Sequence, residues 1–135
     1  TTAGGASRIA RALADAKPAV VIVALGSNDG LRGLPVAQMK ANLVTIVKAA
    51  RSSGAQVLLV GNRMPPNYGA KYAGQFQEAF AEVAREQHVA LVPFLLEPIA
   101  ARRDYFQPDN LHPTAAAQAL LLEPVWKALT PLLKR

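Results

Sequence analysis

Apolar residues in this chain occur in two patterns, continuous runs and stripes with helical spacing. Runs that are apolar at nearly every position are typical of strands buried on both faces of a parallel sheet. Stripes that recur every three or four residues are typical of one face of an α-helix. The predicted strands are AVVIVAL at 19–25, QVLLVG at 56–61 and VALVPF at 89–94, and the predicted helices lie within 7–16, 35–52 and 75–87.

The ends of these elements are predicted from individual residues. Ser7 is a candidate N-cap for the first helix, because a serine hydroxyl accepts a hydrogen bond from a free backbone N–H there. A last helical region is expected to begin at Pro113 and to be interrupted at Pro124, because proline lacks the N–H that continues a helix. Helix and strand therefore alternate along residues 1–135, which favours a single three-layer α/β/α domain with a parallel sheet.

Three polar segments follow the three predicted strands. GSNDGLRG at 26–33 and NRMPPNYGAKY at 62–72 are predicted to be loops, and the third loop leads to DNLHP at 109–113. In a parallel sheet, ligand sites gather in the loops beyond the carboxyl ends of the strands. A functional site is therefore expected at this edge of the sheet.

His112 is the candidate general base. A neutral imidazole can accept a proton near pH 7 when a carboxylate on its other ring nitrogen fixes its tautomer and orientation. Asp109 lies three residues before His112, so one tight turn could bring the two side chains together. The same spacing also fits an Asp109 that caps a turn beside a half-buried His112. The second histidine, His88, ends a predicted helix and is expected at the surface.

The other two loops offer further candidate groups. Gly26 would let the backbone turn sharply or let a ligand approach closely. The amide NH2 of Asn28 is a neutral donor suited to an oxyanion, and a turn-forming N-D-G sequence is the alternative interpretation. Tyr68 lies in a loop stiffened by prolines, where it would line an acyl pocket or simply pack the loop.

A nucleophile is the missing component of this set. The chain has no cysteine, and Ser52 and Ser53 end a helix at the opposite edge of the predicted sheet. Ser27 lies in a suitable loop, but not in a strand-to-helix elbow of the nucleophile type. Metal ligands do not cluster and no phosphate-binding glycine motif occurs, so the residues favour neither a metal site nor a phosphate-binding loop.

The positive charge of the chain gives little support for a different function. The formal net charge is +6, but the 15 lysines and arginines are spread along the whole length without interleaved aromatic residues. A nucleic-acid-binding domain is therefore the least favoured of the functions considered. The longest apolar run is far shorter than the roughly 20 residues that span a bilayer, so no transmembrane segment is expected.

Together, these segments resemble the SGNH (GDSL-type) serine hydrolases. VIVALGSNDGLRG resembles the third conserved block of that family, and DNLHP resembles its fifth block, an aspartate-x-x-histidine. The order of NDGLRG, PPNYG, LVPFLLE and HP is similar to that of the bacterial thioesterase I, lysophospholipase and arylesterase branch. The opening TTAGG resembles the segment just after the glycine of the second block, and the likeness covers essentially the whole chain.

The resemblance implies a flavodoxin-like SGNH hydrolase fold and the hydrolysis of carboxylic esters or thioesters without a metal or cofactor. It implies that His112 is the general base, that Asp109 orients it, and that Asn28 donates to the oxyanion, with Gly26 shaping its loop. Similar proteins are often periplasmic or secreted.

The resemblance also implies that part of the family's domain is absent from this chain. The family's G-D-S serine on the first strand and the oxyanion glycine of its second block have no counterpart here. Without the first strand, a strand edge and apolar surface would be uncovered. We therefore expect one of three arrangements: an N-terminal companion fragment, a longer protein of which this chain is the C-terminal portion, or self-association. The alternative function is an inactive α/β fragment, or a module that binds an acyl ligand without cleaving it.

Overall fold

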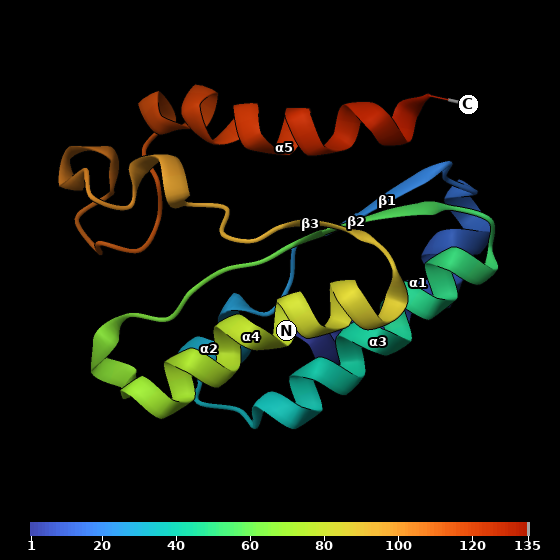
Figure 1. Ribbon diagram of the computed structural model, residues 1–135, viewed down its shortest axis with the longest axis horizontal. Helices are drawn as coiled ribbons and strands as arrows, with labels where there is room; N and C mark the ends of the chain where they lie inside the picture. The colour runs from blue at the N-terminus through green and yellow to red at the C-terminus, as the bar shows by residue number, and fades with distance from the viewer. Residues whose placement is uncertain (135) are drawn as a thin grey trace.

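The computed structural model, described over residues 1–134, has helices on both faces of a three-stranded parallel sheet with the order β1-β2-β3 (Figure 1). This confirms the predicted α/β/α layers and the parallel sheet. The strands are β1 (Val20–Val23), β2 (Gln56–Val60) and β3 (Ala90–Val92), and the helices are α1 (Thr2–Ala16), α2 (Ser27–Leu31), α3 (Val36–Ser52), α4 (Ala70–Gln87) and α5 (Gln118–Leu133). Short 3₁₀ turns lie at Pro66–Tyr68, Glu97–Ile99, Arg103–Tyr105 and Ala115–Ala117.

The two helical layers are unequal. α1, α3 and α4 pack side by side beneath the sheet, and α5 covers β2 and β3 from the other face (Figure 1). The larger core lies on the side of α1, α3 and α4, where Phe76 and Phe80 meet edge to face with ring centroids 5.3 Å apart. The smaller core forms where Leu58, Val60 and Val92 pack against α5.

β1 is an edge strand of the described sheet. It pairs with β2 in a register that aligns Val20 with Gln56 and Val23 with Leu59. The prediction that this strand is buried on both faces is wrong, because Ile22 is 46% exposed. β2 has a partner on each side and is buried from Val57 onward. An uncovered strand edge with apolar surface is therefore present at β1, as expected.

The first helix begins before the predicted position. Thr1 is the N-cap of α1, and its hydroxyl accepts a hydrogen bond from the Gly4 N–H at 3.5 Å. The prediction that Ser7 is the cap is wrong, because Ser7 lies inside α1 and donates to the Gly4 carbonyl. α4 likewise starts at Ala70, so the end of the predicted 62–72 loop belongs to a helix.

The last helix differs from its prediction in two ways. A 3₁₀ turn follows Pro113, and α5 itself begins at Gln118. α5 then runs without interruption through Pro124 and Pro131. Each proline removes one N–H, but apolar side chains along α5 pack on the sheet and stabilise the helix there. In residues 1–134, no helix combines the length and the apolar character needed to cross a bilayer.

Candidate active site

The loop between β3 and α5 brings Asp109 and His112 into contact. Oδ2 of Asp109 lies 2.5 Å from Nδ1 of His112. Oδ1 accepts hydrogen bonds from the backbone N–H groups of Leu111 at 2.9 Å and of His112 at 3.0 Å. Asn110 adopts a left-handed conformation with φ of 59°, which asparagine tolerates better than most residues. The carboxylate is thus fixed by the same short turn that carries the histidine.

These contacts also set the charge of Asp109. They lower its pKa from 3.8 to about 2, with the His112 backbone N–H contributing most and the His112 ring next. A charged carboxylate favours a proton on Nδ1 of the imidazole, which leaves Nε2 as the acceptor. The His112 side chain is 70% exposed. Among residues 1–134, its ring forms a hydrogen bond with Asp109 alone, through Nδ1. The ring is therefore oriented on one side and open on the other.

A small hairpin joins the segments on the two sides of this turn. The Gln107 N–H donates to the His112 carbonyl at 2.7 Å, and the Thr114 N–H donates to the Tyr105 carbonyl at 2.8 Å. The hairpin rests on a separate apolar cluster that includes Ile99. Because these contacts lie on both sides of Asp109 and His112, they hold the turn in place without covering the ring.

Asn28 is the second residue of α2, at the carboxyl end of β1. The prediction of a loop over residues 26–33 is wrong here, because a short helix begins at Ser27 directly after Gly26. The Gly30 N–H bonds to the Gly26 carbonyl, and the Arg32 N–H bonds to the Asn28 carbonyl, both at 3.0 Å. Asn28 is exposed, so its side-chain amide can reach a ligand at this edge of the sheet.

Gly26 is required by the backbone and by the core. Its φ is 120°, a conformation that L side chains rarely adopt. A Cβ at Gly26 would also lie 2.9 Å from Cζ of Phe80 and 3.2 Å from Sδ of Met39. These contacts explain how Gly26 shapes the turn before Asn28, and its contact with a substrate stays a prediction.

Tyr68 packs the loop that follows β2. Its hydroxyl donates to the Leu31 carbonyl at 3.0 Å, and its ring contacts the larger core. Tyr68 therefore ties this loop to the end of α2. Its predicted place in the wall of an acyl pocket stays a prediction.

Serine hydroxyls in residues 1–134 form no hydrogen bond with the His112 ring. Ser27 lies at a strand-to-helix junction, but its hydroxyl accepts a hydrogen bond from Nδ2 of Asn62 at 2.7 Å. Ser52 and Ser53 end α3 at the opposite edge of the sheet, where the Ser53 hydroxyl donates to Ala50. The described chain therefore holds the candidate base and the carboxylate that contacts it, without a serine bonded to the His112 ring.

Three polar residues around α2 were not predicted from the sequence. Asp29 is 3% exposed and accepts hydrogen bonds from both the backbone and the hydroxyl of Thr2. Asn62 is the third, through its hydrogen bond to Ser27. The N-D-G sequence at 28–30 draws attention to Asn28 as a donor, but no spacing in the sequence connects Asp29 with a partner 27 residues away. Only the folded arrangement reveals these contacts.

An apolar hollow runs along the uncovered edge of β1. Its volume is about 550 Å³, and its lining includes Gly5 and Ile9 of α1 and Ile22 and Leu25 beside the strand. It is distinct from the surface turn that carries His112. Within residues 1–134, no group of three or more His, Cys, Asp or Glu side chains is arranged to hold a metal ion.

Comparison with known proteins gives consistent matches along the chain. The sequence model of the GDSL-like Lipase/Acylhydrolase family matches residues 1–120. Esterase TesA of Pseudomonas aeruginosa is 47% identical over 133 residues, which are 98% of this chain and 66% of TesA. Thioesterase 1/protease 1/lysophospholipase L1 of Escherichia coli K12 is 34% identical over 132 residues, which are 98% of this chain and 64% of that protein. The chain thus spans just under two thirds of the length of these relatives.

Solved structures share the fold over the same range. A crystal structure of TesA has a TM-score of 0.95 with this chain at 47% identity, covering 98% of this chain and 74% of that one. The psychrotrophic esterase EstA of Pseudoalteromonas, in a structure inhibited by monoethylphosphonate, has a TM-score of 0.92 at 33% identity. It covers 100% of this chain and 74% of EstA. The predicted SGNH-type arrangement of sheet and helices is therefore confirmed.

Proposed function

We propose that this chain carries the acid–base pair and one oxyanion donor of a serine hydrolase. The starting point is that the chain belongs to the GDSL-like lipase/acylhydrolase family. The proposed reaction is the cleavage of carboxylic esters or thioesters. The observation that carries this proposal is the 2.5 Å contact between Oδ2 of Asp109 and Nδ1 of His112. A charged carboxylate at this distance favours the tautomer with the proton on Nδ1, while the rest of the ring stays accessible.

Each group has a definite task in this reaction. Nε2 of His112 accepts the proton of a serine hydroxyl while the serine oxygen attacks the acyl carbonyl. Asp109 holds the ring and stabilises the imidazolium that forms. The amide N–H of Asn28 donates to the carbonyl oxygen as it becomes negative. His112 then protonates the departing alcohol or thiol, and a water molecule releases the acid by the same steps.

The serine itself is proposed to come from sequence outside these 135 residues. Ser27 is the described serine at the carboxyl edge of the sheet, and its hydroxyl is engaged by Asn62. Ser7 and Ser53 bond to carbonyls within their own helices. These contacts support a nucleophile from the part of the family's domain that this chain does not span.

The uncovered edge of β1 is a suitable place for that part to join. Ile22 is 46% exposed there, and the hollow beside it is lined mainly by apolar side chains. A further strand paired with β1 would cover this surface and would bring a residue at its carboxyl end to the edge where Asn28 lies. We propose an N-terminal companion segment for this position, with self-association of the chain as the alternative.

The substrate class is proposed from chemistry and from relatives. The relatives are named an esterase and a thioesterase/lysophospholipase, and all of these names describe acyl transfer to water. A base, an orienting carboxylate and an amide donor serve oxygen and sulfur esters alike. We therefore propose small acyl esters or thioesters as substrates, with Tyr68 in the wall of the acyl site.

A binding module without catalysis is the second candidate, because no described serine bonds to His112. Hydrolysis of a short-chain aryl ester and of an acyl thioester by the complete protein separates the two candidates. The proposed function predicts turnover that disappears in His112→Ala. A binding module would retain the ester without cleaving it, and the substitution would leave the rate at background.

His88 supplies a matched control for this experiment. It is exposed at the end of α4, where its φ of 54° suits asparagine better than alanine. His88→Asn should therefore keep wild-type turnover and melting temperature. Full activity in His112→Ala would overturn the assignment of the base, whatever the behaviour of His88→Asn.

A further inference from the structure

A buried carboxylate lies directly beside the proposed oxyanion donor. Asp29 is 3% exposed and Thr2 is 0% exposed. The Thr2 hydroxyl donates to Oδ2 of Asp29 at 2.6 Å, and the Thr2 backbone N–H donates to Oδ1 at 2.8 Å. Within residues 1–134, no lysine or arginine forms an ion pair with Asp29. The proposed reaction does not use this carboxylate, so its burial requires another explanation.

Burial of a carboxylate is unfavourable unless hydrogen bonds and a compensating charge surround it. Thr2 is the first residue of α1, a helix of 15 residues, and the free N–H groups at a helix start carry partial positive charge. Nδ2 of Asn42 donates to the Thr2 hydroxyl oxygen at 3.2 Å, which leaves the hydroxyl hydrogen for Asp29. Asp29 thus joins the start of α1 to α2 in a defined geometry.

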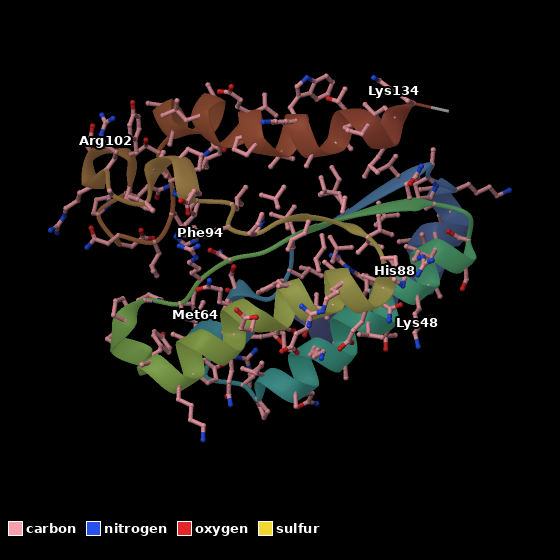
Figure 2. All side chains as sticks on the ribbon, viewed as in Figure 1. Lys48, Met64, His88, Phe94, Arg102 and Lys134 are labelled. Carbon is pink, nitrogen blue, oxygen red and sulfur yellow. The ribbon has the colours of Figure 1, made fainter. Side chains whose placement is uncertain are left out.

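Asn28 lies between two anchored residues. Ser27, on one side, accepts a hydrogen bond from Asn62 at the end of β2. Asp29, on the other side, is held by Thr2. Asn28 itself is exposed, so its direction depends on these two neighbours rather than on packing of its own side chain. α2 lies close to Met64, which is labelled in Figure 2, because a Cβ at Gly30 of this helix would lie 2.5 Å from Sδ of Met64.

We propose that Thr2 and Asp29 are a positioning pair that fixes the direction of the Asn28 amide toward the reacting carbonyl. The inference rests on the proposed function, because it requires Asn28 to be an oxyanion donor. Such a donor works only within a narrow range of distances from the oxyanion. A shift of α2 by about 1 Å is expected to lower the rate by up to about 10²-fold, while the substrate still binds.

Thr2→Val in the complete enzyme tests this inference. The substitution keeps the shape of the side chain but removes the hydroxyl donor to Asp29. We expect kcat to fall roughly 10- to 100-fold, with KM changed by less than about 3-fold. Thr2→Ser retains the hydroxyl and should restore kcat to within about 3-fold of wild type.

Thr45→Val is the matched control for the loss of a threonine hydroxyl. Thr45 is exposed on α3, and its hydroxyl donates to the Ala41 carbonyl of the same helix. Its substitution should leave kcat unchanged. A fall in kcat of the same size in Thr45→Val would contradict a specific role for Thr2.

The decisive comparison repeats Thr2→Val in an Asn28→Ala background. If Thr2 acts through Asn28, the second substitution causes no further fall in kcat. A pair that only stabilises the fold would lower kcat by the same factor in both backgrounds, and this result would overturn the inference. If Thr2→Val does not fold, Asn42→Ala replaces it, with an expected loss of about 3- to 10-fold that must also vanish in the Asn28→Ala background.

Failure of the proposed function would give a different result from failure of the positioning pair. In that case His112→Ala keeps wild-type hydrolysis or Asn28→Ala keeps the full kcat, before Thr2 is changed. An active, His112-dependent enzyme in which Thr2→Val and Asn28→Ala lower kcat independently would overturn the positioning pair alone.

Discussion

The two halves of the candidate site are held in opposite ways. α2, which carries Asn28, lies against the larger core, and the neighbours of Asn28 are bound by Asn62 and Thr2 from distant parts of the chain. The turn that carries Asp109 and His112 lies at the surface, and backbone N–H groups within three residues hold its carboxylate. The position of the proposed oxyanion donor therefore depends on the whole fold, whereas that of the proposed base depends on a local turn.

This difference agrees with the task proposed for each group. An oxyanion donor acts through one short hydrogen bond whose geometry exists only in the transition state, so a rigid support increases its effect. A general base must exchange a proton with the serine and then with the leaving group, so its ring must remain accessible. His112 has that access, since its side chain is 70% exposed.

The largest effect is expected from Asp109→Asn, which breaks the local half of the site. The new amide can still accept the two backbone hydrogen bonds, but its NH2 would face Nδ1 and favour the wrong tautomer of His112. We expect kcat to fall on the order of 10³- to 10⁴-fold. The melting temperature should change little, because the residue is exposed. A kcat within about 10-fold of wild type would contradict the role of Asp109 as orienter.

Asn28→Ala breaks the other half of the site. It should lower kcat by roughly 10²- to 10³-fold, as expected for the loss of one oxyanion donor. Because Asn28 is exposed, the thermal unfolding curve should stay close to that of wild type. Steady-state kinetics with an aryl ester measure the effect, and an unchanged kcat would mean that the donor lies elsewhere.

Gly30→Ala tests the rigid support beneath Asn28. A Cβ at Gly30 would lie 2.5 Å from Sδ of Met64 and 2.7 Å from Cε2 of Phe76. We expect a loss of about 1–3 kcal/mol in unfolding free energy, together with a lower kcat, because α2 must shift. Gly74→Ala in α4 is the matched control: no atom lies within 4 Å, and it should stabilise the protein by about 0.5–1 kcal/mol. Denaturant unfolding distinguishes the two, and equal stabilities would contradict the account of α2.

The smallest effect concerns pH and the surface turn. The pKa of Asp109 is lowered to about 2, so its contacts stabilise the turn above the ordinary value of 3.8 and are lost as pH falls through about 2. An NMR titration of the Asp109 carboxyl carbon should give a midpoint near 2. In His112→Ala the midpoint should move back toward 3.8 without reaching it, because the backbone donors remain. A wild-type midpoint at 3.8 would contradict the described turn.

The parts of this molecule that could be predicted from sequence depend on local signals. The three strands were predicted because their apolar runs are continuous, and the contact of Asp109 with His112 was predicted because it spans three residues. α2 was missed because its Ser-Asn-Asp-Gly sequence favours a turn when it is considered alone. Packing of Gly30 against Met64 and Phe76 helps to hold this segment as a helix.

The long-range polar contacts could not be predicted from the sequence. The contact of Thr2 with Asp29 spans 27 residues, and that of Asn62 with Ser27 spans 35 residues. No periodicity marks such pairs, because each belongs to a different element. The apolar run alone did not predict the exposure of Ile22, since such a run does not reveal whether a neighbouring strand is present, and the uncovered surface was expected only from the family resemblance.

The proposal that His112 is the base of a serine hydrolase is tested most directly by intact mass. The complete protein is measured after reaction with a fluorophosphonate, and wild type is compared with His112→Ala. We predict one label on a serine in wild type and labelling at least about 10³-fold slower in His112→Ala, because the serine loses its base. The 135-residue chain alone should take no label. Equal labelling rates in wild type and His112→Ala, or a complete protein that takes no label, would contradict the claim that His112 and Asp109 are the acid–base half of a serine hydrolase.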